Sequence, residues 1–340
     1  MIEDGLLATP YRELLLQYPF LSDFFSAQGL PLPAAACSLA VYFDHLSENH
    51  VADLGLGREE LKIRFLGFFR QMETFRSEGK ESVRQVTILG GHDKNGCEEK
   101  VRLELRPGDV VSVVGPTGSG KSRLLADIEC LAQGDTPSGR RILINQAPPQ
   151  ASARLSGEGQ LVAQLSQNMN FVMDLSVREF LQMHAESRLV ADRTEVIGRI
   201  YDTAVALAGE PFTLDTPVTA LSGGQSRALM IADVACLSAS PIVLIDEIEN
   251  AGVDRRRALE LLVQQGKIIL LATHDPLLAL LAERRLVIKN GAIVAVLETS
   301  AQEQTDLVRL DAFDRQLALL REQLRCGGRI RLDKAIFGGH

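Results

Sequence analysis

The sequence lacks several features that other classes of protein need. It has no tryptophan, and aromatic residues make up only 5% of its 340 residues, so few rings are available to stack on bases or to form a belt at a membrane interface. The 36 lysines and arginines are outnumbered by 44 aspartates and glutamates, which gives a net charge of -8. A broad cationic face for the phosphate backbone is therefore not expected, and nucleic acid is disfavoured as a partner.

Long apolar runs and paired cysteines are also missing. No run approaches the roughly 20 apolar residues that span a bilayer, so we expect no transmembrane segment. The five cysteines are widely spaced without a CxxC pair, which disfavours a disulfide framework or a zinc site. The amino terminus lacks the basic and apolar regions of a secretory signal. We therefore expect a cytoplasmic protein that is at most peripheral at the inner face of the membrane.

The spacing of apolar residues divides the chain into three predicted domains. Residues 1–82 repeat apolar positions at three- and four-residue spacing, which predicts a small all-α domain. Residues 83–300 alternate β-rich runs with helical segments, a pattern that predicts an α/β domain around a largely parallel sheet. Residues 301–340 contain a charged segment over 302–325 that predicts a helix, followed by a glycine-rich basic tail.

The α/β region is defined by short β-rich runs. Those over 110–114, 242–245 and 268–272 are nearly pure apolar, which is typical of strands buried on both faces of a sheet. The predicted strands cover residues 83–89, 101–105, 110–114, 242–245, 268–272, 286–289 and 292–297.

In the amino-terminal region, one helical face carries a stripe of large apolar residues. Its members are Leu61, Phe65, Phe68, Phe69 and Met72. Spacings of three and four residues place them on one side of a helix. The stripe predicts core packing, with a docking face for a partner as the alternative.

The most specific motif is a glycine-rich loop between a predicted strand and a predicted helix. Residues 115–122 match the pattern G-x-x-x-x-G-K-[ST] in this setting. Glycines allow successive N–H groups to point at phosphate oxygens, and the positive end of the following helix adds to the attraction. Lys121 should reach the β- and γ-phosphates, and Ser122 should ligate Mg²⁺. The predicted nucleotide-binding residues are Gly115, Pro116, Thr117, Gly118, Ser119, Gly120, Lys121, Ser122 and Arg123.

An acidic pair follows the apolar run 242–245. Asp246 is placed to hold Mg²⁺ through water, and Glu247 is placed to polarise an attacking water as a general base. A solvated acidic pair at a strand end accounts for the same two residues about as well. A further motif is needed to decide between these interpretations.

That motif is a pentapeptide in front of a predicted helix over 228–237. It consists of Leu221, Ser222, Gly223, Gly224 and Gln225. With this pentapeptide the chain resembles, from about residue 83 to residue 300, the ABC ATPase superfamily, whose signature has the same sequence. The motifs follow the family order: phosphate loop, Gln-loop, signature, Asp-Glu strand, D-loop and switch histidine. A serine hydroxyl and glycine N–H groups at a helix start form an anion site.

The resemblance implies a fold and further site residues. The fold is an ABC-type P-loop NTPase with a mostly parallel core sheet, an antiparallel β subdomain and a helical signature subdomain, preceded here by the small all-α domain. Gln167 resembles the Gln-loop residue, with Gln164 as its competitor, and Asp254 resembles the D-loop residue that couples two sites. His274 resembles the switch histidine that contacts the γ-phosphate. The implied catalytic residues are Glu247, His274 and Gln167, and the implied metal ligands are Ser122, Gln167 and Asp246.

The chain departs from the family pattern near the nucleotide base. Residues 90–96 contain no tyrosine or phenylalanine where the family has an aromatic residue that stacks on adenine. His92 is the candidate replacement, so selectivity for adenine stays open. Arg123 adds a charge near the phosphates, whereas Ser122 keeps the metal site.

The resemblance also implies partners. Each chain holds one phosphate loop and one signature, and in the family the signature faces a nucleotide held by the other subunit. We therefore expect a head-to-tail homodimer that uses ATP and Mg²⁺. Hydrolysis of ATP should reopen this dimer and so drive a conformational change in a client.

The sequence leaves the client open. One candidate is a separate membrane subunit of a transporter, which is the commonest use of such a domain. The other is a soluble client protein, favoured by the all-α domain ahead of the cassette. The sequence Asp-Glu-Ile-Glu from Asp246 also favours a soluble client, because this sequence is similar to that of soluble ABC ATPases of recombination and repair. A nucleic-acid maintenance ATPase is a third alternative, against which the net charge and the lack of a long heptad run both argue.

Overall fold

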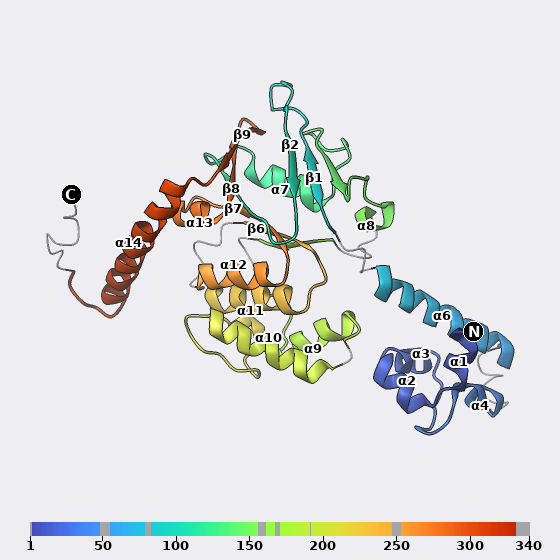
Figure 1. The fold of residues 1–340 in the computed structure, drawn as a ribbon. Coiled ribbons are helices and arrows are strands. Elements are labelled where there is room, and N and C mark those ends of the chain that lie inside the picture. Colours follow the sequence, from blue (N-terminus) through green and yellow to red (C-terminus); the bar gives the residue numbers. More distant parts are fainter. Residues whose placement is uncertain are drawn as a thin grey trace.

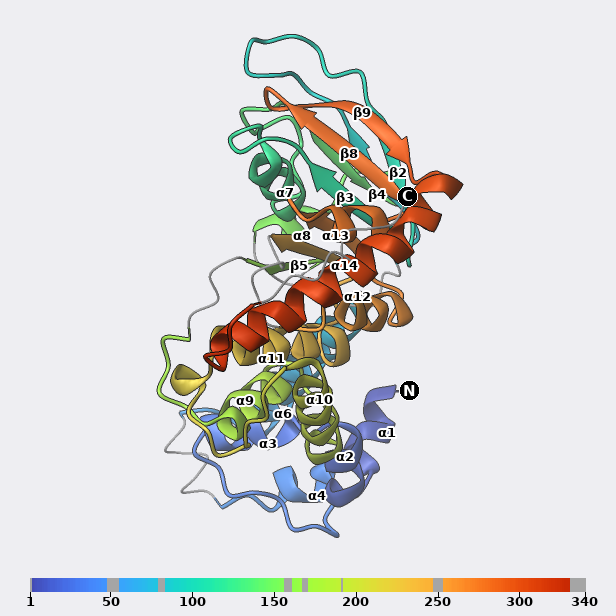
Figure 2. The ribbon, with the colours of Figure 1, turned by 90° about the vertical axis from the view of Figure 1, so that its left-hand side faces the viewer.

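The computed structural model describes residues 2–47, 55–78, 83–155, 161–166, 171–190, 192–246 and 253–330. Helices form the amino-terminal part, an α/β body follows, and a long carboxy-terminal helix extends from the body on the side away from the amino-terminal helices (Figure 1). Turned by 90°, the molecule shows this last helix crossing in front of the body (Figure 2).

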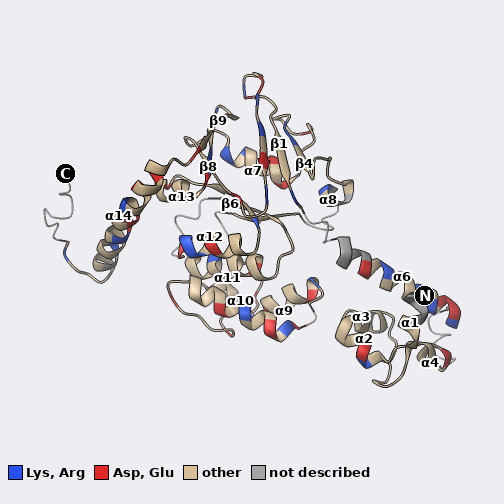
Figure 3. Ribbon diagram, viewed as in Figure 1, with Lys and Arg blue, Asp and Glu red and all other residues tan. Residues whose placement is uncertain are grey.

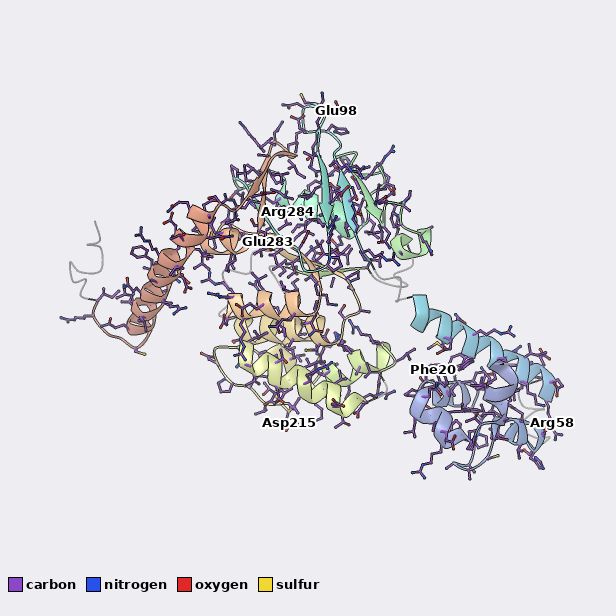
Figure 4. All side chains as sticks on the ribbon, viewed as in Figure 1. Phe20, Arg58, Glu98, Asp215, Glu283 and Arg284 are labelled. Carbon is purple, nitrogen blue, oxygen red and sulfur yellow. The ribbon has the colours of Figure 1, made fainter. Side chains whose placement is uncertain are left out.

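The amino-terminal helices pack around an aromatic core. They are α1 (Ile2–Ala8), α2 (Tyr11–Gln17), α3 (Leu21–Ala27), α4 (Leu39–Asp44) and α6 (Arg58–Glu78). Phe20, labelled in Figure 4, and Phe25 are at most 1% exposed. The predicted stripe of α6 belongs to the same cluster, with Leu61, Phe65 and Phe69 buried in it. The stripe is therefore core packing, and the alternative of a docking face is wrong.

A mostly parallel sheet forms the centre of the α/β body. Its strands are β3 (Val110–Val114), β5 (Val162–Leu165), β6 (Ile242–Asp246), β7 (Ile268–Ala272), β8 (Arg284–Lys289) and β9 (Ala292–Glu298). They lie in the order β5-β6-β7-β3-β8-β9. Every neighbouring pair is parallel except β8 with β9, as the prediction of a mostly parallel core requires.

Helices cover both faces of this sheet. They are α7 (Lys121–Glu129), α11 (Gly223–Cys236), α12 (Arg255–Gln264) and α13 (Pro276–Leu281). Alternate residues of a strand point to opposite faces. In β6, Ile242 and Leu244 pack in one cluster with α7, whereas Val243 and Ile245 pack in another with α11 and α12. Burial on both faces explains why the sequence of these strands is almost continuously apolar.

A smaller antiparallel sheet packs beside the core sheet. Its strands are β1 (Val86–Leu89), β2 (Arg102–Leu105) and β4 (Arg141–Ile144), in the order β2-β1-β4. The sequence analysis missed β4 and β5, which have only four residues each: β4 has three apolar residues after Arg141, and β5 interrupts its apolar positions with Gln164. Apolar runs this short do not distinguish a strand from a helix.

A helical subdomain completes the body. It consists of α9 (Val177–Ser187), α10 (Arg193–Leu207) and α11, which share a core that includes Phe180, Ile200 and Leu229. The short helix α8 (Ala151–Leu155) precedes β5. Leu189, just after α9, packs against the amino-terminal aromatic core, so the all-α part contacts this subdomain.

The carboxy-terminal helix α14 (Ala301–Arg325) is fixed at its start by a charged cap. Glu303 accepts a hydrogen bond from the Ser300 N–H at 2.9 Å, and Arg285 of β8 donates a second to Glu303 at 2.5 Å. These bonds, the backbone one first, lower the pKa of Glu303 to about 2.

Acidic and basic residues are interspersed along the elements of the fold (Figure 3). Among the described residues, no helix is both long enough and apolar enough to cross a membrane. The division into domains at residues 82 and 300 stays a prediction.

Candidate nucleotide-binding site

Three motif segments meet at the carboxyl ends of neighbouring parallel strands. The phosphate loop follows β3, Asp246 ends β6, and His274 lies just beyond β7, the strand between them. Backbone pairing aligns these ends, since Ala272 of β7 pairs with both Val113 of β3 and Asp246. Ligands of open α/β sheets bind at this edge.

The phosphate loop has a backbone conformation that glycine adopts easily. Gly118 and Gly120 have φ angles of +76° and +111°. A Cβ on Gly120 would lie 2.8 Å from the Cα of Gly291, so a side chain would collide with backbone. Within the described chain, no group accepts a hydrogen bond from the N–H of Gly118, Gly120, Lys121 or Ser122. Together with the positive end of α7, these N–H groups have the arrangement that an anion site requires.

Lys121 begins α7 and lies inside the loop. The residue is 7% exposed, and its Nζ donates hydrogen bonds to the carbonyl oxygens of Gly115 at 2.8 Å and Pro116 at 3.4 Å. The Nε2 atom of His274 lies 3.5 Å from the same Nζ. The structure thus brings together the lysine and the histidine that the sequence analysis assigned to the γ-phosphate.

Two other segments hold the phosphate loop from outside. Lys94 donates from Nζ to the carbonyl oxygen of Gly118 at 2.9 Å. The N–H of Gly291, in the turn between β8 and β9, donates to the carbonyl oxygen of Ser119 at 2.7 Å. Because the C=O and N–H of a trans peptide unit point in opposite directions, the bond from Gly291 to the Ser119 carbonyl keeps the N–H of Gly120 turned inward. The bond from Lys94 fixes the preceding peptide unit, whose N–H, that of Ser119, donates to the carbonyl oxygen of Pro116 at 3.1 Å.

The segment that carries Lys94 is itself well ordered by hydrogen bonds. Asp93 accepts from the N–H of Cys97 at 2.9 Å and from Asn290 Nδ2 at 3.0 Å. These bonds, the one from Cys97 first, hold the pKa of Asp93 below its ordinary value. His92 is exposed and packs its ring on Gly139, since a Cβ at Gly139 would lie 3.1 Å from His92 Nε2.

A buried ion network supports the same turn. Arg140 is 0% exposed; it donates to Glu99 from Nε and Nη2 at 2.8 and 2.9 Å and to Asp127 of α7 from Nη1 at 2.9 Å. Its Nη2 also donates to the carbonyl oxygen of Gly291 at 2.6 Å. Burial opposes the charge of Arg140, but the bonds to both carboxylates raise its pKa above the ordinary value. These bonds connect α7, the segments before β2 and β4 of the small sheet, and the turn between β8 and β9.

The signature forms the start of α11. Ser222 is the N-cap and accepts a hydrogen bond from the N–H of Gln225 at 3.3 Å, while the Gln225 side chain accepts one from the N–H of Ser222 at 2.9 Å. Leu221 is 9% exposed and anchors this start in the helical subdomain core. The remaining signature residues, Gly223 and Gly224, open the helix. Helices α7 and α11, which begin at the phosphate loop and at the signature, pack on opposite faces of the core sheet.

The other predicted site residues are placed as follows. Gln167 and Glu247 lie outside the described residues. Gln164, the competitor of Gln167, lies in β5, with its amide nitrogen 2.9 Å from the Glu129 carboxylate when the amide is oriented to donate. Asp254 is the N-cap of α12 and accepts from the N–H of Arg257 at 3.1 Å. Thr117 and Arg123 are exposed on the loop and on the first turn of α7.

The sequence analysis did not predict the contacts made by Lys94, Arg140 or Gly291. The dipeptide Asn290-Gly291 is a strong hairpin signal and could have located the turn, although not its contact with the phosphate loop. Nothing in the sequence indicates that Arg140 and Glu99 meet, because charged residues far apart in the chain carry no pairing pattern.

The sheet order, the loop geometry and the helical subdomain define an ABC-type P-loop NTPase. A model of the ABC transporter family matches residues 99–250. The chain is 51% identical over 249 residues to an uncharacterized ABC transporter ATP-binding protein, MJ0121, of Methanocaldococcus jannaschii; the match covers 73% of this chain and 95% of that protein. The chain therefore belongs to the ABC ATPase family and is an ATP-hydrolysing enzyme.

More distant matches agree with this assignment. The macrolide export ATP-binding/permease protein MacB of Campylobacter jejuni is 29% identical over 243 residues, which cover 68% of this chain and 36% of that protein. Among solved structures, an ATP-binding subunit of an ABC transporter has a TM-score of 0.51 at 21% identity, covering 69% of this chain and 94% of that one. CbiO1 of Clostridium perfringens has a TM-score of 0.50 at 22% identity, covering 68% and 98%. At these identities the structural likeness shows the fold alone.

Proposed function

We propose that two copies of this chain form a head-to-tail homodimer that binds two ATP molecules, each between the phosphate loop of one copy and the signature of the other. The observation that carries the proposal is the packing of α7 and α11 on opposite faces of one sheet. A nucleotide held at the start of α7 therefore meets a signature only when a second copy supplies it. A two-fold axis gives each copy the same role.

The residues at the strand ends fit a magnesium ion. Ser122 supplies a hydroxyl oxygen on the first turn of α7, and Asp246 supplies a carboxylate at the end of β6. Mg²⁺ favours such oxygen donors and usually takes only one or two carboxylates, the rest being phosphates and water. When bound, Mg²⁺ would be held by Ser122 and Asp246 and would neutralise charge that develops on the phosphates.

The chain's own residues bind the phosphates, orient the attacking water and accept its proton. The N–H groups of the phosphate loop bind the phosphates, and Lys121 exchanges its bond to the carbonyl of Gly115 for one to the γ-phosphate. Glu247 accepts the proton of the attacking water, while Gln167 and His274 orient that water and the γ-phosphate. Asp254 couples the two sites across the dimer. Loss of the γ-phosphate removes contacts that exist only in the closed dimer, which then opens.

A complementation experiment tests the arrangement in trans. Lys121→Ala removes the phosphate-loop cation, and Gly223→Asp puts a negative charge at the signature. A Cβ at Gly223 would meet nothing within 4 Å, and an acidic residue suits a helix start, so the second variant should fold normally. Each variant alone should be inactive. In the proposed dimer, a mixed pair keeps one site with both motifs intact.

Mixing the two variants should therefore restore ATPase activity. Random exchange makes about half of the dimers mixed, each with one intact site of two, so the rate should rise to at most about a quarter of wild type. If each chain completed its own site, mixing would restore nothing, since every chain would carry one defect. A mixture that stays inactive after the subunits have exchanged would overturn the proposal.

We favour a separate membrane subunit of a transporter as the client. The support is the description of MJ0121 and MacB as transporter proteins. The protein would then act in the cytoplasm, peripheral to the membrane. A soluble client is the second candidate, supported by the all-α part and its contact with the helical subdomain through Leu189. Affinity purification of Glu247→Gln with ATP should recover an integral membrane protein; recovery of a soluble enzyme alone would decide for the second candidate.

A further inference from the structure

Arg255, the first residue of α12, joins three parts of the chain through one guanidinium group. Its Nη1 donates to the carboxylate of Asp275 at the start of α13, and its Nη2 donates to Asp314 of α14 at 2.6 Å. The Arg255 side chain is 20% exposed, and those of Asp275 and Asp314 are 17% and 32% exposed. Figure 2 shows α14 crossing the body at the level of α12 and α13. Arg255 therefore connects α14 to both of these helices.

Asp275 holds the segment that carries His274. Its Oδ1 atom accepts a hydrogen bond from the N–H of Leu277 at 2.8 Å and so caps α13, while its Oδ2 atom accepts from Arg255. The N–H of Asp275 donates to Thr273 Oγ1 at 3.0 Å. Because both carboxylate oxygens have partners on different elements, Asp275 is held from two sides. The backbone of His274, the preceding residue, is held with it.

The start of α12 is also connected to the helical subdomain. The N–H of Asp254 donates to the carbonyl oxygen of Leu207, the last residue of α10, at 3.2 Å. Arg257 donates from Nη1 to the carbonyl oxygen of Ala206 at 3.3 Å. Helix α10 shares its core with α11, the helix that begins at the signature. The start of α12 thus lies between the subdomain that carries the signature and the segment that carries His274.

We propose that Arg255 is a positioning residue for ATP hydrolysis: it holds His274 in place through Asp275, and Asp314 of α14 holds Arg255. This inference rests on the role of His274 at the γ-phosphate in the proposed function. Within the described residues, the guanidinium group bonds to these two carboxylates and to no residue of the phosphate loop. Arg255 therefore affects the rate of hydrolysis and not the binding of ATP.

The first test removes the cation. Arg255→Met keeps most of the apolar stem. Arg256→Met is the matched control, because Arg256 is the next residue of α12 and pairs with Glu260 at 3.0 Å on an exposed face. Arg255→Met should lower kcat by about 10- to 100-fold, since a misplacement of about 1 Å at the reacting groups costs up to this much. Its KM and Kd for ATP, and the stoichiometry of ATP binding by calorimetry, should equal those of wild type, which would exclude loss of folded protein as the cause.

The second test removes the link to α14. Asp314→Ala takes away one of the two partners of Arg255. The control Asp311→Ala removes a carboxylate of similar exposure, 29%, that pairs with Arg315 within α14 at 2.7 Å. Asp314→Ala should give a kcat between those of wild type and Arg255→Met, whereas Asp311→Ala should leave kcat unchanged. Because Asp314 acts through Arg255, adding Asp314→Ala to Arg255→Met should lower kcat no further.

A third variant separates this inference from the proposed function. His274→Ala should itself slow hydrolysis, and in that background Arg255→Met should slow single-turnover release of phosphate little more. Equal fold-losses from Arg255→Met with and without His274 would overturn the positioning role and leave the proposed function intact. A raised KM with unchanged kcat, or equal behaviour of Arg255→Met and Arg256→Met, would overturn it as well. An unchanged rate in His274→Ala would instead count against the proposed role of His274, on which the inference rests.

Discussion

The buried network around Arg140 yields a prediction of large magnitude. Arg140→Met keeps most of the length and apolar stem of the side chain but removes the guanidinium group. Glu99 and Asp127 then lose their shared cation, and both carboxylates are at most 1% exposed, so water cannot replace it. Breaking a buried ion pair by removing one partner costs about 3–5 kcal/mol.

This cost converts to a shift of the melting temperature. For 150–250 residues, each 1 kcal/mol corresponds to about 2–4 °C, so the cassette of Arg140→Met should melt about 6–20 °C below that of wild type. Far-ultraviolet circular dichroism or calorimetry can follow the transition. The affinity for ATP should fall as well, because Arg140 holds the turn at Gly291 that contacts the phosphate loop.

Arg102→Met is the matched control. Arg102 makes an ion pair with Glu104 at 3.0 Å, but these side chains are 58% and 42% exposed. Exposed pairs of this kind contribute about 0.2–1 kcal/mol, so the control should melt within about 4 °C of wild type. Equal shifts for Arg140→Met and Arg102→Met would refute the reasoning. Adding Glu99→Gln to Arg140→Met should recover part of the loss, since it removes an uncompensated buried charge.

Three further predictions follow from single contacts. Gly120→Ala should abolish ATP binding measured by calorimetry, because its Cβ would lie 2.8 Å from Gly291 Cα; binding near the wild-type level would show that the turn moves freely. Lys94→Met should weaken ATP binding, and Lys94→Arg should restore most of it, because the cation holds the carbonyl of Gly118; equal affinities in all three proteins would remove this role. Glu303 has a folded pKa of about 2, below its ordinary value of 4.5, so its contribution to stability is present above pH 4.5 and is lost as the pH falls toward 2. Glu303→Gln should therefore show a smaller drop in melting temperature over this interval than wild type, and an equal drop would exclude Glu303 as a contributor.

Much of the fold was predictable because its signals are local. The strands over residues 110–114, 242–246 and 268–272 are buried on both faces. A strand buried on both faces needs apolar residues at consecutive positions, and such a run can be recognised in the sequence. The phosphate loop and the signature are contiguous motifs. The loop glycines allow backbone angles that other residues adopt rarely, and Ser222 caps the start of α11. The short strands β4 and β5 have neither property and were missed.

The contacts that support the site could not be predicted, because they join residues distant in sequence. Arg140 meets Glu99 and Asp127 only after the small sheet packs on α7, and Lys94 meets Gly118 only after the segment before β2 reaches the loop.

The central claim is that ATP closes two copies of this chain on one another. The most direct measurement is the molar mass of Glu247→Gln in excess Mg²⁺ and ATP, compared with the molar mass of the same protein without nucleotide. The account predicts a species of twice the 37.1 kDa of one chain that reverts when ATP is replaced by ADP. A mass of one chain with ATP, in a protein shown to bind the nucleotide, would contradict it.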